Sequence, residues 1–247
     1  MSLDRYYSSL WAVKGEEDRF IKERDWFHRC FLDKIFDPWV NDKHQVARRL
    51  LSGGERLLDV GCWGGESVVK MGALEKYREV YGVDFLREAV ESAKAKGIRV
   101  FQVDLNSEPL PFEDNFFDAV TCISVLEHVL DPIAVLREIH RVIAPNREFI
   151  VQVPNVASLS NRIRILFGRV PVTSWDPGWD GWHLHYFTLY DLKKLLVEEG
   201  FVIDRIEPDG AFPWFRKFVM PLNGFVIRCR KRVVAMSAIR PRPDKGE

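Results

Sequence analysis

Short apolar runs alternate along this chain with stretches in which apolar residues recur at helical spacing. The apolar runs fall at residues 57–60, 79–84, 98–104, 116–124, 148–153, 201–206 and 225–230. Helical spacing follows the second run over residues 86–96 and returns over residues 189–200. Strands that alternate with helices in this way predict an α/β fold, with helices packed on a largely parallel sheet.

Capping residues indicate where two of the predicted helices begin. Asp131 followed by Pro132 is typical of an N-cap and a first helical turn, and Thr188 is a second expected N-cap. Gly200 is expected to end the helix that starts after Thr188.

The first apolar run leads into a glycine-rich turn. Leu57-Leu58-Asp59-Val60 reads as a buried strand, Gly61 and Gly64-Gly65 follow it, and a helix opens at Glu66. Glycines let the backbone approach a ligand closely, and a helix start presents N–H groups, so this turn predicts a nucleotide-type cofactor site. A dinucleotide-binding loop would need glycine at positions 63 and 66, where Trp63 and Glu66 stand, and the P-loop pattern is absent as well.

The acid Asp59 in front of Gly61-Cys62, with Gly65 behind, resembles the first motif of the class I S-adenosylmethionine (SAM) methyltransferases. Trp63 stands where that family usually has its middle glycine. Two later strands also end in acids: Asp84, 19 residues after Gly65, and Asp104. An acid about 20 residues past the loop is suited to accept the ribose hydroxyls of a nucleotide. The resemblance covers about residues 50–205.

The resemblance implies SAM as the cofactor. In the family the glycine loop wraps the methionine part, the second strand-end acid meets the ribose and the third meets the adenine amino group. The expected cofactor-binding residues are Asp59, Gly61, Cys62, Gly65, Asp84, Phe85, Asp104, Leu105 and Ser124. The implied fold is Rossmann-like, a seven-stranded, mostly parallel sheet with helices on both faces. Its last strand, residues 225–230, should run antiparallel between the fifth and the sixth strands.

Two further parts of the chain are typical of small-molecule methyltransferases such as those of quinone biosynthesis. One runs from Leu110-Pro111-Phe112 through Glu127-His128 to Leu136-Arg137-Glu138, and the other is Val153-Pro154-Asn155. The implied function is methyl transfer from SAM to a small or amphipathic acceptor, with an oxygen nucleophile favoured. The signatures of nucleic-acid amine and cytosine-carbon methyltransferases are absent, so no nucleic acid is expected. Two alternatives stay open, a SAM-binding protein without catalysis and a nucleotide-dependent oxidoreductase.

A hydroxyl nucleophile must lose a proton, and a histidine with a near-neutral pKa suits that task. The candidates are His128, just past the fourth predicted strand, and His183 and His185 after the fifth. A structural role is the alternative for His128, and packing for the other two. His183 and His185 could also bind a metal, but no third ligand is evident, so no metal is expected.

The predicted organisation has three parts. Residues 1–52 form a helical cap, residues 53–235 the methyltransferase domain, with a substrate lid inserted at 156–188, and residues 236–247 a basic flexible tail. The formal net charge is zero, yet residues 211–247 hold nine basic and two acidic residues, so a weak membrane-surface contact of this segment is one option. The cysteines lack metal spacing and no signal peptide is visible, so a cytoplasmic protein with reduced thiols is expected. The oligomeric state stays open.

Overall fold

The computed structural model describes residues 42–174, 183–209 and 224–232. Most of the predicted helical cap, the tryptophan-rich part of the lid at 175–182 and the basic tail at 236–247 lie outside the described residues. The described residues contain no helix that is long and apolar enough to cross a membrane.

The described strands are β1 (Gly54–Val60), β2 (Tyr77–Asp84), β3 (Arg99–Gln102), β4 (Phe117–Ile123), β5 (Ile143–Val153), β6 (Phe201–Asp209) and β7 (Gly224–Lys231). The described helices are α4 (Lys43–Leu50), α5 (Glu66–Lys70), α6 (Ala73–Lys76), α7 (Arg87–Lys94), α8 (Pro132–Val142), α9 (Leu159–Leu166) and α10 (Leu189–Glu198). Asp131 and Thr188 cap α8 and α10 as predicted, because each side chain accepts a hydrogen bond from the first helical turn. Gly200 follows α10 at a left-handed φ of 89°.

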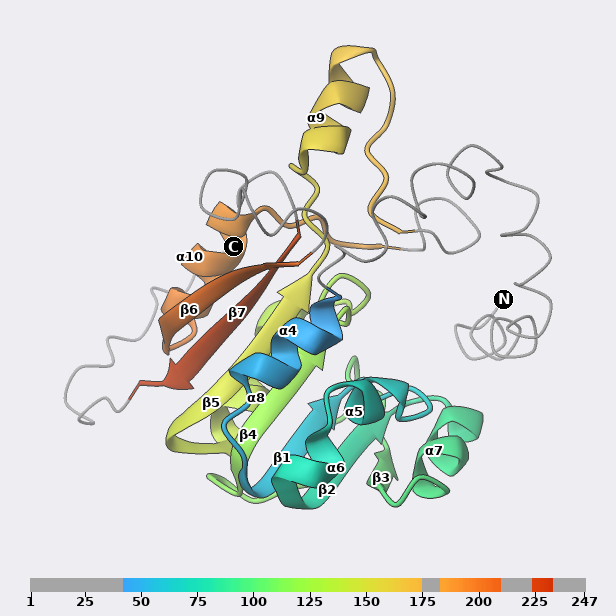
Figure 1. The fold of residues 1–247 in the computed structure, drawn as a ribbon, viewed down its shortest axis with the longest axis vertical. Coiled ribbons are helices and arrows are strands. Elements are labelled where there is room, and N and C mark those ends of the chain that lie inside the picture. The colour runs from blue at the N-terminus through green and yellow to red at the C-terminus, as the bar shows by residue number, and fades with distance from the viewer. Residues whose placement is uncertain (1–41, 175–182, 210–223, 233–247) are drawn as a thin grey trace, which may run out of the picture.

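The strands form one seven-stranded sheet in the order β3-β2-β1-β4-β5-β7-β6 (Figure 1). Neighbours from β3 to β5 pair in parallel, and β7 pairs antiparallel with both β5 and β6. The predicted α/β fold class and the placement of the last strand between the fifth and sixth are therefore confirmed. Since six strands run the same way, their carboxyl ends meet at one edge, where α/β sheets bind ligands.

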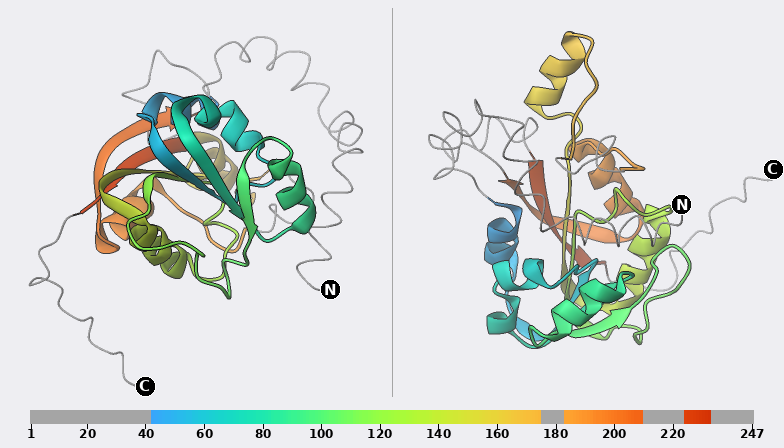
Figure 2. Two further views of the ribbon diagram at one scale, coloured as in Figure 1. Left: turned by 90° about the horizontal axis from the view of Figure 1, so that it is seen from below. Right: turned by 90° about the vertical axis from the view of Figure 1, so that its right-hand side faces the viewer.

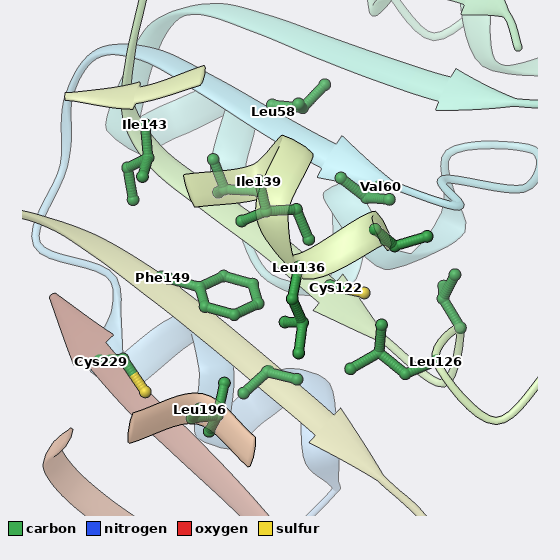
Figure 3. Packing of buried hydrophobic residues seen from close by; sticks show 14 of the residues in the cluster. Leu58, Val60, Cys122, Leu126, Leu136, Ile139, Ile143, Phe149, Leu196 and Cys229 are labelled. Atoms are coloured by element: carbon green, nitrogen blue, oxygen red, sulfur yellow. The ribbon is translucent and has the colours of Figure 1, made fainter. Parts of the chain in front are cut away.

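The strands bury alternate residues on opposite faces, and each face has its own core. Leu58, Val120 and Phe149 pack on the side of α8 and α10, whereas their neighbours Leu57 and Ala119 pack on the side of α4, α5 and α7. Figure 3 shows Leu136 and Ile139 of α8 lying over the first face, near Phe149. The sheet is thus covered on both faces, as predicted. Cys62, Cys122 and Cys229 are buried free thiols.

Of the strands that extend beyond their predicted limits, β5 and β6 bear on the carboxyl edge. β5 starts at Ile143 instead of residue 148 and passes through Asn146, whose φ of 60° is left-handed. Asn146 stands where the resembled family usually has a glycine, and asparagine is among the few residues that tolerate this conformation. β6 continues past residue 206 to Asp209, where its pairing with Gly224 brings a buried carboxyl to the carboxyl edge.

Candidate active site

The glycine loop turns sharply at the end of β1. The N–H groups of Gly61 and Cys62 both donate to the carbonyl oxygen of Val83, at 2.9 and 3.0 Å. Gly61 has a φ of 68°, and a Cβ at this position would collide with the side chain of Val125. Trp63 is also left-handed, with a φ of 49°. The loop therefore keeps the bent path of a glycine-rich cofactor turn even though a tryptophan replaces one glycine.

Asp84 holds this loop from the end of β2. Its Oδ2 accepts the backbone N–H of Trp63 at 2.8 Å, and its Oδ1 accepts that of Leu86 at 3.0 Å. Burial raises the pKa of Asp84, while these backbone hydrogen bonds lower it in part. Because each carboxylate oxygen has two lone pairs, the fixed carboxylate retains acceptor capacity for a pair of hydroxyl groups.

Asp59 lies beneath the same loop. Its side chain is 1% exposed, and its Oδ1 accepts the hydroxyl of Thr121 at 2.6 Å. Its Oδ2 is buried and has no hydrogen-bond partner among the described residues. Burial raises the pKa of Asp59 to about 7, and the nearby Asp84 adds to the rise. Asp59 is thus a buried acid whose charge a bound cation would stabilise.

The remaining expected cofactor residues differ in their surroundings. Asp104 is exposed after β3 and caps its own turn, accepting from the N–H of Asn106 and the hydroxyl of Ser107. Leu105 packs partly against the core, and Phe85 is half-buried. The thiol of Cys62 is buried, which raises its pKa strongly, so only its backbone is suited to contact a cofactor. Gly65 is the left-handed N-cap of α5, with a φ of 82°.

A second group of polar side chains gathers beyond β4. Glu127, His128 and His183 each offer a ligand atom, and these atoms lie within 4.8 Å of one another. The rings of His128 and His183 meet edge to face at 4.7 Å, and Nδ1 of His183 lies 2.6 Å from the hydroxyl of Thr173. The three groups can take up or pass on a proton, and their spacing also suits a divalent cation.

Glu127 is the most deeply buried member of this group. Its side chain is 1% exposed, and neither carboxylate oxygen has a hydrogen-bond partner of standard geometry among the described residues. Burial raises the pKa of Glu127 to about 7; its own backbone, Lys43 and Ser124 lower it in part. A buried carboxyl that titrates near neutrality is a physical signature of a functional site.

His185 lies apart from the other two candidate histidines. The N–H groups of Leu184 and His185 both donate to the carbonyl oxygen of Glu127, which ties this segment to the end of β4. The His185 ring instead turns toward the carbonyl oxygen of Leu130, with Nε2 at 3.3 Å. The structure therefore brings His128 and His183 together and separates His185 from them.

Ser124, expected to contact the cofactor, directly follows β4 in a left-handed conformation with a φ of 56°. Its hydroxyl accepts from Nζ of Lys43 at 2.6 Å and donates to Oε1 of Gln152 at 2.9 Å. The amide of Gln152 donates in turn to Asp209 at 3.2 Å. Burial raises the pKa of Asp209 to about 6, and Lys43 lowers it in part. Backbone strain at the end of a central strand is typical of functional positions.

The carboxyl edge thus carries four buried acids: Asp59, Asp84, Glu127 and Asp209. Such an edge favours a cationic ligand, because each added positive charge relieves the cost of ionising a buried carboxyl. Sequence reasoning missed Lys43, Gln152 and Asp209 entirely. It noted the Glu127-His128 pair but assigned a role only to the histidine.

The sequence matches known methyltransferases. A family model described as a methyltransferase domain matches residues 58–151. A ubiquinone biosynthesis O-methyltransferase from Xanthomonas oryzae pv. oryzae is 38% identical over 118 residues, which cover 44% of this chain and 47% of that protein. The match therefore spans about half the length of such curated relatives.

The fold matches solved structures over most of the chain. A SAM-dependent methyltransferase from Methanosarcina mazei has a TM-score of 0.58 at 23% identity, covering 78% of this chain and all of that one. A structure described as a cyclase has a TM-score of 0.57 at 19% identity, covering 79% and 88%. The expected resemblance to class I SAM-dependent methyltransferases and the Rossmann-like fold are thus confirmed. The matches also agree with an enzyme of the methyltransferase class that uses SAM, although a fold by itself does not define a reaction.

Proposed function

We propose that this protein transfers a methyl group from SAM to an oxygen atom of a small or amphipathic acceptor. The observation that carries the proposal is the cluster of Glu127, His128 and His183 near the carboxyl edge of the sheet. An alcohol or phenol holds its proton near neutral pH and gains nucleophilicity when a nearby group removes it. Three groups able to accept a proton, within 4.8 Å of one another, meet that requirement.

The residues at the ends of β1 and β2 fit the cofactor. The bend at Gly61 leaves no room for a side chain, and the fixed carboxylate of Asp84 retains lone pairs for the ribose hydroxyls. Asp59, Gly65 and Ser124 would lie about the methionine part, and Asp104 and Leu105 about the adenine. Bound SAM supplies a methyl group already activated on a cationic sulfonium, which suits the acidic edge.

The chain's own residues then orient the acceptor and move its proton. Glu127 or His128 would accept that proton, while Thr173 holds the ring of His183. Alignment of two reactants can supply roughly 7–11 kcal/mol of the barrier reduction, so positioning carries most of the rate. The predicted lid contains three tryptophans, which favour an acceptor with an apolar ring or chain. These residues, Trp175, Trp179 and Trp182, lie outside the described residues.

Relatives provide further support for oxygen as the accepting atom. The printed name of the Xanthomonas oryzae relative is an O-methyltransferase of ubiquinone biosynthesis. Because the match covers about half of that protein, we extend only the acceptor class to this chain: a hydroxylated ring, with or without an apolar tail. No nucleic acid is proposed as substrate, and a cytoplasmic location stays an expectation.

The proposal is tested by measuring production of S-adenosylhomocysteine with a panel of hydroxylated aromatic compounds, with and without alkyl chains. We expect turnover with at least one phenol and a 10²- to 10⁴-fold lower kcat for Glu127→Gln or His128→Asn, whichever residue is the base, at similar SAM affinity. His140→Asn is the matched control, because His140 lies on α8 against Phe201. SAM binding without turnover of any acceptor would favour the non-catalytic alternative, and NAD binding in place of SAM would favour the oxidoreductase.

A further inference from the structure

Helix α9 and the chain that returns from it stand away from the rest of the described structure. Figures 1 and 2 show α9 projecting beyond the end of β5, at the same end of the sheet as the candidate active site. All residues from Arg162 to Val170 are exposed except Arg164, which is half-buried. We call residues 158–172 the α9 arm.

Large apolar side chains dominate the exposed surface of the α9 arm. Leu166 is 79% exposed, Phe167 74% and Ile165 56%, and the same surface carries Val170, Ile163, Leu159 and Val172. Isolated exposed apolar residues are common on proteins, but a contiguous group of this kind marks an interaction site.

The apolar residues lie mainly on one face of the helix. Leu159, Ile163 and Leu166 are spaced by four and three residues, which places them on one side of α9. Asn161 lies on the other side; it is 2% exposed and its Oδ1 accepts the N–H of Val172 at 2.9 Å. The arm therefore packs against its own returning chain through Asn161 and presents the apolar face outward.

The charges of the arm are all of one sign. It contains Arg162, Arg164 and Arg169 and no acidic residue. Nε of Arg162 donates to the carbonyl oxygen of Ala157 at 2.8 Å, and Nε of Arg164 to that of Val170 at 2.9 Å. These bonds fix two guanidinium groups on the arm and leave further N–H donors on each.

We propose that the α9 arm binds the surface of a bilayer that contains anionic phospholipid. Apolar side chains of an amphipathic segment enter the boundary between headgroups and acyl chains, and guanidinium groups pair with lipid phosphates. A purely apolar surface would suit another protein equally, but three arginines without an acid favour a negatively charged partner. The inference goes beyond the proposed function, because it holds whichever atom is methylated.

The test is co-sedimentation of the full chain with phosphatidylcholine vesicles that contain or lack phosphatidylglycerol. We expect binding to the anionic vesicles, at least tenfold weaker in Leu166→Ser/Phe167→Ser and in Arg162→Gln/Arg169→Gln. Tyr190→Ser on α10 is the matched control, because Tyr190 is 75% exposed but lies outside the arm, and it should bind as the unaltered protein does.

Failure of the unaltered protein to bind anionic vesicles would overturn the proposal. So would undiminished binding by both double variants, which would place the contact elsewhere, for example in the basic residues 211–247. Analytical ultracentrifugation of the unaltered protein and of Leu166→Ser/Phe167→Ser tests a third outcome. If the double substitution abolishes self-association and not vesicle binding, the α9 arm contacts a second copy of the chain and the proposal is overturned. SAM affinity, measured on the same variants, should not change, which separates this test from that of the methyl transfer.

Discussion

Replacing Asp84 by Asn tests the cofactor site at a side chain that two backbone hydrogen bonds hold in place. The carboxylate accepts backbone N–H groups from Trp63 and Leu86, at 2.8 and 3.0 Å, and it is expected to accept the ribose hydroxyls of SAM. Asparagine keeps the shape of the side chain but loses the charge. Its NH₂ group must also face one of the two backbone donors.

The magnitude of the effect follows from these contacts. A hydrogen bond to a charged group contributes about 1.5–3 kcal/mol and a neutral one about 0.5–1.5, so each of two ribose bonds should lose roughly 1 kcal/mol. A total of about 2 kcal/mol corresponds to an approximately 30-fold higher Kd for SAM. In the protein without SAM, the substitution has two opposing effects on stability. It removes a charge that is costly to bury, and it leaves one backbone N–H donor without an acceptor. The unfolding free energy should therefore change by no more than about 2 kcal/mol.

Isothermal titration calorimetry with SAM measures the affinity, and urea unfolding without SAM measures the stability. Glu79→Gln is the matched control: Glu79 is an acid on the same strand, but it pairs with Tyr81 and Arg99 away from the carboxyl edge. Equal SAM affinity for Asp84→Asn and the unaltered protein, or an equal loss in Glu79→Gln, would refute the assignment of Asp84 to the ribose.

Three further predictions test the site. Burial raises the pKa of Asp59 to about 7, so the folded protein keeps a proton that the unfolded chain releases near pH 4, and the free energy of unfolding should fall as the pH rises toward 7. Asp59→Asn should remove roughly 2–3 kcal/mol of this loss between pH 5 and 8. An unchanged pH dependence of urea unfolding in the variant would contradict this. Gly61→Ala should destabilise the protein by about 1–3 kcal/mol, because the position has a left-handed φ and the added Cβ collides with Val125. A second substitution, Val125→Ala, should restore part of that stability. If it restores none, the collision does not contribute to the loss. His183→Ala should lower kcat at least tenfold and His185→Ala less, since only His183 joins the cluster; the reverse order in steady-state assays would return the role to His185.

Local sequence determined the elements of this fold. Each strand shows its apolar run, and Asp131 and Thr188 cap their helices by contacts within three residues, so these features depend on near neighbours alone. The bend at Gly61 and the acid Asp59 are read from one contiguous motif, and Asp84 is read from its place at the end of the next strand, 19 residues after Gly65. The order of the sheet, with β7 between β5 and β6, was predicted from the family resemblance and not from the apolar pattern.

The acceptor end of the site was decided by tertiary structure. Glu127 and His183 lie 56 residues apart in the chain, and Lys43 reaches Ser124 across 81 positions. No local pattern encodes such pairs, because they depend on which strand ends share one edge and on how far β6 extends beside Gly224. Burial has the same origin: whether a carboxyl titrates near pH 4 or near 7, and whether Leu166 and Phe167 face the core or the solvent, follows from the packing of the whole chain.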